Sequence, residues 1–122
     1  MKKEKSLLSG STTLLVLSLL ESQDRYGYEM IAELERRSDN TFTLKEGTLY
    51  PILHGLEREE LIQSYLKAAG TDESAGNGRS RKYYHITTAG LRALAEKKAE
   101  WRRFSACVNK VIGGEAHAYA SI

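Results

Sequence analysis

Apolar residues recur with the period of an α-helix in four stretches of the chain and with the period of a β-strand in two. The helical stretches are residues 7–21, 26–37, 44–58 and 88–111, and the strand-like stretches are residues 62–67 and 81–86. The first helix, with a cap near Ser9 or Ser11, is apolar on more than one side, which predicts burial against two neighbours. Residues 68–80 are polar and rich in glycine, so a long hairpin with a mobile tip is expected there.

The third helical stretch has two contrasting faces. On a helical wheel its apolar residues fall within about 100° of one another; they are Leu49, Ile52, Leu53 and Leu56. The opposite side is narrow, starts with a small residue and can form hydrogen bonds; it holds Gly47, Pro51, His54 and Arg58. A helix exposed only to solvent would usually carry more charge there, so we interpret this side as a surface that enters a binding partner.

The start of this third helix can be placed in two ways. Thr43 followed by Glu46 has the spacing of a capping box, which predicts an early start. Pro51 would then lie inside the helix and crowd the carbonyl of Gly47, and a slight kink is expected. In the alternative, Thr48 is the cap and Pro51 lies in the first turn. We favour the early start.

The last helix, capped by Thr87 and running to about Val111, carries a heptad of apolar residues. Its members are Leu91, Leu94, Trp101, Val108 and Ile112, with Lys98 and Ser105 as interruptions and Phe104 and Val111 at its margins. No earlier element is left to cover so long a helix, so we expect it to project and pack on a second copy of the chain. Gly113 and Gly114 should end it, and residues 115–122 should form a flexible tail.

Composition narrows the protein class. With 122 residues, 41% hydrophobic and 28% charged, the chain is expected to form one domain plus an additional helix. The net charge of +2 is weak, so any nucleic-acid surface must come from the placement of the charges. The apolar run from Leu14 to Leu20 is too short to span a bilayer and is not followed by a cleavage site, which predicts a cytoplasmic protein without a membrane partner.

The sequence contains no recognisable catalytic or metal-binding arrangement. His54, His85 and His117 are not at metal-ligand spacing, and the single cysteine, Cys107, cannot form an internal disulfide. We interpret Cys107 as a small apolar residue, with redox sensing as the alternative. There is no glycine-rich phosphate loop, nucleophile elbow or pair of acids. We therefore expect no enzymatic activity and no cofactor.

Cations and tyrosines flank the third helix. Arg79, Arg81 and Lys82 lie at the base of the hairpin, where they either contact phosphates or protect a solvated strand edge. Three tyrosines are expected to join the second and third helices, with a phosphate hydrogen bond as the alternative for each; they are Tyr26, Tyr28 and Tyr50.

Three helices, two strands and a further helix form the element order of a winged helix, and three motifs resemble the PadR family of bacterial transcriptional regulators. The motifs are Tyr26-Gly27-Tyr28-Glu29, Glu46-Gly47-Thr48-Leu49-Tyr50-Pro51-Ile52-Leu53 and Arg81-Lys82-Tyr83-Tyr84-His85-Ile86-Thr87-Thr88-Ala89-Gly90. The single short C-terminal helix is similar to that of the smaller PadR subgroup. One departure is Glu59-Glu60, where the family often has a glycine after the recognition helix.

The resemblance implies a mainly α (α+β) homodimer with a two-stranded wing. Its expected parts are a winged helix-turn-helix in residues 1–88, a dimerisation helix in residues 89–114 and the tail. As a repressor of stress, detoxification or efflux genes it would bind an inverted-repeat operator in double-stranded DNA and respond to a small aromatic effector. The DNA-binding residues would be Lys45, Thr48, Tyr50, Pro51, His54, Arg58, Arg79, Arg81 and Lys82. The ligand-binding residues would be Trp101, Phe104 and Val108. The alternative is a winged-helix protein-interaction module without DNA binding, which Glu46, Glu57, Glu59 and Glu60 near the reading helix favour.

Overall fold

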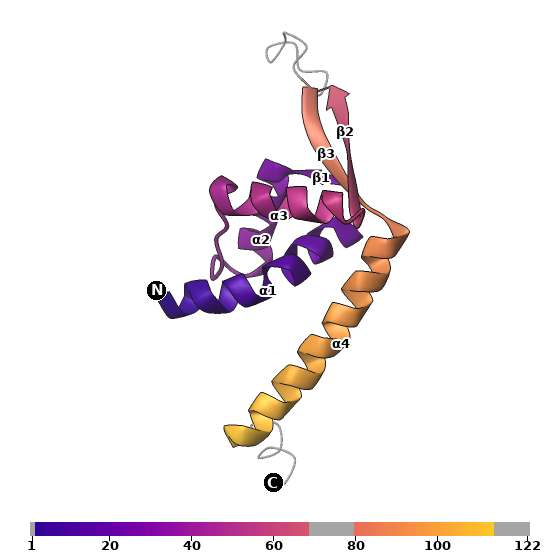
Figure 1. The fold of residues 1–122 in the computed structure, drawn as a ribbon. Helices are drawn as coiled ribbons and strands as arrows, with labels where there is room; N and C mark the ends of the chain where they lie inside the picture. The colour runs from indigo at the N-terminus through magenta and orange to yellow at the C-terminus, as the bar shows by residue number, and fades with distance from the viewer. Residues whose placement is uncertain (1, 69–79, 114–122) are drawn as a thin grey trace.

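The computed structural model describes residues 2–68 and 80–113, and the side chains from residue 11 onward within these ranges. Arg79, Gly114, His117 and the predicted tail lie outside the described residues. The elements follow the order α1 (Lys2–Glu21), β1 (Arg25–Tyr26), α2 (Gly27–Arg37), α3 (Glu46–Arg58), β2 (Ile62–Ala68), β3 (Ser80–Ile86) and α4 (Thr88–Val111). Helices α1 to α3 form a body from which β2 and β3 extend on one side, while α4 runs away in the opposite direction (Figure 1). The predicted winged helix, mainly α with a two-stranded wing, is confirmed.

The sheet has a third strand that the sequence pattern did not predict. The strand order is β1-β3-β2, and both pairs are antiparallel. The wing pairs Ile62 with Ile86 at its base and Ala68 with Ser80 at the far end of the described strands. Strand β1 consists of two residues, Arg25 and Tyr26, which is too short for any alternation of apolar and polar positions to be visible.

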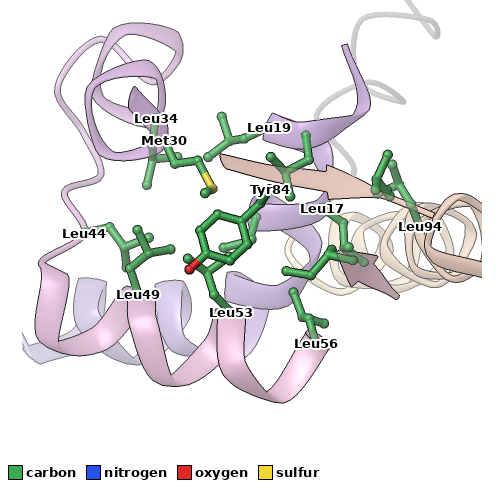
Figure 2. Close-up of a cluster of buried hydrophobic side chains, with 14 residues drawn as sticks. Leu17, Leu19, Met30, Leu34, Leu44, Leu49, Leu53, Leu56, Tyr84 and Leu94 are labelled. Atoms are coloured by element: carbon green, nitrogen blue, oxygen red, sulfur yellow. The ribbon is translucent and has the colours of Figure 1, made fainter. Parts of the chain in front are cut away.

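The core lies where α1, α2 and α3 meet the sheet. Leu49 and Leu53 of α3 are fully buried and surround the ring of Tyr84, which enters from β3 (Figure 2). Burial of this ring raises the pKa of Tyr84 to about 12, because the phenolate would have to form away from water. On α4, Leu94 is buried, so only the first part of that helix joins the core.

Helix α1 begins earlier than predicted. It runs from Lys2, and Ser9 and Ser11 lie within it rather than capping it. Its first residues are mostly lysine, glutamate and serine, which are compatible with a helix but carry no apolar period. Helix α2 begins at Gly27, one residue after the predicted start, and the backbone N–H of Tyr26 donates to Glu29 Oε1 at 3.1 Å.

Both predicted starts of α3 are wrong. Its N-cap is Lys45, whose backbone is extended and whose carbonyl accepts hydrogen bonds from the N–H groups of Thr48 and Leu49, both at 2.9 Å. Leu44, just before this cap, is buried in the core, and the helix begins three residues after Thr43. Pro51 lies inside α3, as the early start required. Gly47 is exposed, so water can hydrate the carbonyl that Pro51 leaves without its usual partner.

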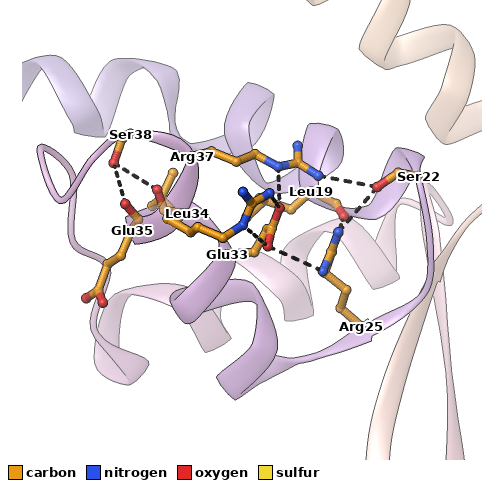
Figure 3. Close-up of polar contacts among 9 residues, drawn as sticks. Leu19, Ser22, Arg25, Glu33, Leu34, Glu35, Arg37 and Ser38 are labelled. Atoms are coloured by element: carbon orange, nitrogen blue, oxygen red, sulfur yellow. Dashed lines mark hydrogen bonds and ion pairs between the residues drawn. The ribbon is translucent and has the colours of Figure 1, made fainter.

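A cluster of charges joins α1, β1 and α2 (Figure 3). The buried Arg25 donates from Nε to the carbonyl of Leu19 at 2.7 Å, and both Arg25 and Arg37 donate to Ser22 Oγ at 3.3 Å. Arg37 Nε also donates to Glu33 Oε2 at 2.7 Å. These contacts tie the end of α1 to α2 and thereby fix the helix on which α3 packs.

The N-terminus of α4 is held as predicted. Thr87 Oγ1 accepts a hydrogen bond from the N–H of Gly90 at 3.0 Å and donates to the carbonyl of Glu60 at 2.8 Å. A Cβ atom on Gly90 would lie 2.1 Å from the carbonyl oxygen of Leu61, so only glycine permits this close approach.

Candidate nucleic-acid interface

The two faces predicted for α3 are present. Leu49 and Leu53 point into the core with no exposed surface, whereas Thr48, Pro51 and His54 are exposed on the other side. At the ends of the helix, Lys45 and Arg58 are also exposed. The helix therefore presents a narrow surface with hydrogen-bonding groups, flanked by a cation at each end.

Tyr50 differs from the other predicted base-contacting residues because it is half-buried. A Cβ atom on Gly27 would lie 2.3 Å from the hydroxyl oxygen of Tyr50, so the ring packs closely on the start of α2. The Tyr50 and His54 ring centroids are 6.4 Å apart. Tyr50 thus joins α2 to α3, as predicted for this tyrosine, and borders the exposed face.

One of the glutamates in or near α3, Glu57, has a structural role. Ser64 Oγ of β2 donates a hydrogen bond to Glu57, which ties the C-terminal end of α3 to the wing. Glu46 lies in the first turn of α3, where a negative charge interacts favourably with the helix dipole. Because both acids have a structural role, their presence is compatible with the binding of an anionic partner elsewhere on the exposed face of α3.

The cations of the wing lie on tyrosine rings. The guanidinium of Arg81 is 4.6 Å from the ring centroid of Tyr26, and Lys82 Nζ is 5.8 Å from that of Tyr84. Adjacent residues of a strand point to opposite faces, so Arg81 and Lys82 do not form a single patch. Lys82 shares the face of the buried Tyr84, and Arg81 the outer face of the sheet.

Sequence reasoning missed Lys67, the residue directly opposite Arg81. Its Nζ lies 5.1 Å from the ring centroid of Tyr83, so the outer face of the wing carries two cations side by side. The signal was available in the strand register: pairing the apolar residues Ile62 and Ile86 at the base brings Lys67 opposite Arg81.

A carboxylate joins both wing strands to the segment between α1 and β1. Asp24 accepts a hydrogen bond from the Tyr65 hydroxyl at 2.6 Å and lies 2.9 Å from His85 Nδ1. Partial burial opposes ionisation, but hydrogen bonds from Tyr65 and His85 lower the pKa of Asp24 below its ordinary value. The same carboxylate, by accepting a hydrogen bond from the phenol, raises the pKa of Tyr65 to about 12.

The distal part of α4 exposes the predicted ligand-binding residues. Trp101 is 48% exposed and Phe104 61% exposed, and their ring centroids are 5.8 Å apart. Val108, one heptad beyond Trp101, is exposed as well. Lys98, which interrupts the apolar series, forms an ion pair through its Nζ with Glu21 of α1 at 3.0 Å. Cys107 is exposed, so it is not part of a packed core within one chain.

Comparison with known proteins identifies the family. The model of the transcriptional regulator PadR-like family matches residues 16–96. The chain belongs to this family. A PadR-like transcriptional regulator from Bacillus cereus is 36% identical, with a TM-score of 0.74 over 90% of this chain and 99% of the other. A PadR family regulator from Clostridium difficile is 38% identical, with a TM-score of 0.67 over 84% of this chain and 99% of the other.

A further comparison comes from sequence. Transcriptional regulator Rv3488 of Mycobacterium tuberculosis is 33% identical over 92 residues, which are 75% of this chain and 74% of the other. This protein is therefore a transcriptional regulator, and PadR-like regulators are DNA-binding proteins without enzymatic activity that usually dimerise.

Two other classes of site are absent from the part of this PadR-like protein that the structure describes. Within residues 2–68 and 80–113, no group of three or more His, Cys, Asp or Glu side chains is arranged to hold a metal ion. In the same part of the chain, no helix is long and apolar enough to cross a membrane.

Proposed function

We propose that this PadR-like regulator is a homodimeric, cytoplasmic repressor that binds an inverted-repeat operator and releases it when a small aromatic molecule binds. The observation that carries the DNA-binding part is the polarity of α3: one side packs into the core, and the other is exposed and carries hydrogen-bonding groups. In a helix-turn-helix, such an exposed face enters the major groove.

The residues of α3 divide into two roles. Thr48, Pro51 and His54 read base edges, and Tyr50, which packs on α2, sets the position of His54 beside it. Lys45 and Arg58, one at each end of the helix, contact phosphates. Cations at both ends and small groups between them fit a duplex better than they fit an apolar protein groove.

The wing adds phosphate contacts. Arg81 and Lys82 are exposed cations near the far end of the described wing strands, and Arg79, outside the described residues, keeps the same assignment from the sequence. Their tyrosine partners restrict the side chains without neutralising their charge.

The effector and the second subunit meet along α4, within residues 89–114. The exposed apolar series of this helix packs on its copy, and Trp101, Phe104 and Val108 flank the site at which a flat ligand stacks. The regulated genes belong to stress, detoxification or efflux responses.

A salt titration on duplex DNA tests the proposal. Changing Arg81 or Lys82 to alanine should weaken binding to all duplexes and reduce the slope of log affinity against log salt by about one unit per lost contact. Changing His54 to alanine should instead alter sequence preference. Arg92→Ala, on the exposed side of α4, is the matched control and should leave both properties unchanged.

Footprinting provides the second measurement. A symmetric dimer should protect two regions about 34–36 Å apart, one per reading helix. If the purified protein shows no salt-dependent binding to any duplex, the DNA-binding proposal is wrong and the protein-interaction module is the better interpretation.

A further inference from the structure

The segment between α1 and β1 contacts the wing through one side chain. Asp24 Oδ2 accepts from the hydroxyl of Tyr65 on β2, and Asp24 Oδ1 lies 2.9 Å from Nδ1 of His85 on β3. Each oxygen of the carboxylate is therefore used by a different strand of the wing. Besides these contacts, the body holds the wing through β1, which pairs two residues with β3, through the hydrogen bond from Ser64 to Glu57, and through the buried ring of Tyr84.

A series of tyrosine rings in contact connects this carboxylate to the cations on the outer face of the wing. Tyr65 stacks on Tyr83 at 5.8 Å with an interplanar angle of 18°, and Tyr83 meets Tyr26 edge to face at 5.3 Å. Lys67 lies over the ring of Tyr83 and Arg81 over that of Tyr26. A change in the position of Tyr65 thus reaches both cations of the outer face through rings in contact.

We propose that Asp24 is a positioning residue for DNA binding, one that holds the wing at the angle to α3 at which wing and reading helix contact the same duplex. The proposal rests on the proposed function, because it requires that the protein bind duplex DNA. Asp24 itself does not contact DNA: a carboxylate would repel the phosphates.

Because of this repulsion, the direction in which a substitution of Asp24 changes DNA affinity distinguishes a positioning role from a purely electrostatic effect. Replacing Asp24 with asparagine removes one negative charge and, by electrostatics alone, should strengthen binding to a polyanion. If Asp24 holds the wing, the same substitution should weaken binding. When only about a third to a tenth of the molecules have the wing in the competent position, the dissociation constant rises about 3- to 10-fold.

The matched control is Asp39→Asn. It makes the same change of charge in the turn after α2, where Asp39 has a φ of 52° that asparagine adopts readily. Tyr65→Phe is a second variant that removes only the hydroxyl, leaves the net charge unchanged and keeps the ring on Tyr83. Each variant is first compared with wild type by circular dichroism and thermal unfolding, and affinities are measured on one operator duplex at fixed salt.

The expected result is weaker binding by Asp24→Asn and Tyr65→Phe, and unchanged or slightly tighter binding by Asp39→Asn. In a variant that already lacks both cations of the outer face, Lys67→Ala with Arg81→Ala, Asp24→Asn should cause less additional loss, because this face of the wing then has little left to contribute. General destabilisation would not depend on the wing cations in this way.

Two results would overturn the proposal while leaving DNA binding intact. One is wild-type binding to DNA with Asp24→Asn and Tyr65→Phe binding as tightly as Asp39→Asn does. The other is a loss of the same size in the presence and absence of the wing cations. Failure of the wild-type protein to bind any duplex would instead reject the proposed function.

Discussion

Glu33 shows how a single carboxylate can join three arginines. It accepts hydrogen bonds from Arg36 and Arg37 on its own helix, and Arg25 Nη1 lies 3.9 Å from its Oε1. The carboxylate is only 14% exposed, so water competes weakly for these bonds. The hydrogen bonds from Arg36 and Arg37 lower the pKa of Glu33 to about 2. The charged form is therefore favoured in the folded protein relative to the unfolded chain.

This shift predicts an acid-dependent stability. Because the folded pKa lies below the ordinary value of 4.5, the contribution of Glu33 is complete above about pH 4.5 and is lost as the pH falls toward 2. The free energy of unfolding of Glu33→Gln, measured by denaturant titration, should therefore approach that of wild type across this interval. Glu96→Gln on α4 is the matched control. A constant difference between Glu33→Gln and wild type from pH 6 to pH 2 would contradict the prediction.

At the scale of the elements, the turn after α3 keeps a geometry that usually requires glycine. Glu60 has a φ of 63°, and the N–H groups of Glu60 and Leu61 donate to the carbonyls of Glu57 and Leu56, both at 2.9 Å. These two bonds form a Schellman motif with Glu60 at the left-handed position. The turn therefore forms with glutamate at the left-handed position, and the departure at Glu59-Glu60 from the family's frequent glycine adds backbone strain.

Glu60→Gly should stabilise the protein. The left-handed conformation costs a residue with a Cβ about 1–2 kcal/mol, and the greater freedom of glycine in the unfolded chain offsets roughly half of the gain. We expect a net increase of about 0.5–1 kcal/mol in the free energy of unfolding. Glu59→Gly is the control, because Glu59 has a φ of −84° and should only lose stability. A decrease for both variants would show that Glu60 is not strained.

Elements whose apolar residues recur with a clear period could be predicted from the sequence. Elements whose bounds are set by tertiary contacts could not. The inner and outer faces of α3 followed from the spacing of Leu49 and Leu53, and Thr87 was recognised as the cap of α4. Next to the start of α3, Leu44 is buried in the core against residues that are distant in the sequence, and no local pattern reports such burial. Strand β1 exists because β3 offers it an edge.

The same distinction applies to the candidate interface. The exposure of His54 and Arg58 could be predicted from a helical wheel, because it depends on residues of the same helix. The direction of the Tyr50 ring depends on the space left by Gly27, and the contact of Asp24 with Tyr65 joins residues that are 41 positions apart. Contacts of this kind require the register of the sheet and the packing of two helices.

At the scale of the whole molecule, α4 is the helix whose apolar residues lack packing partners within the described part of one chain. Beyond Leu94 its large apolar residues are exposed, with Val111 at 85% and Ile112 at 68%. A second copy of the chain would cover them, in agreement with the usual dimerisation of PadR-like regulators. Because α4 joins the core near Leu94 and Gly90, a movement between two such helices would change the spacing of the two reading helices.

Trp101 provides the test of whether the exposed apolar face of α4 also binds a ligand. It is the sole tryptophan, and about half of its side chain is already covered within one subunit. Covering the remaining half of an indole removes roughly 75–125 Å² from water, an upper bound of about 2–3 kcal/mol per subunit. The exposed residues Phe104, Val111 and Ile112 can supply more, so the dimer does not depend on Trp101 alone.

We therefore expect Trp101→Ala to remain a dimer that binds DNA but no longer responds to ligand. In the wild type, planar aromatic compounds should quench the Trp101 emission and lower operator affinity by a coupling of about 1–3 kcal/mol. Val111→Ser is the matched control: it should weaken the dimer, measured by analytical ultracentrifugation, and retain the quenching. If Trp101→Ala is monomeric and no aromatic compound perturbs the wild-type emission, Trp101 is an interface anchor and the ligand response is absent.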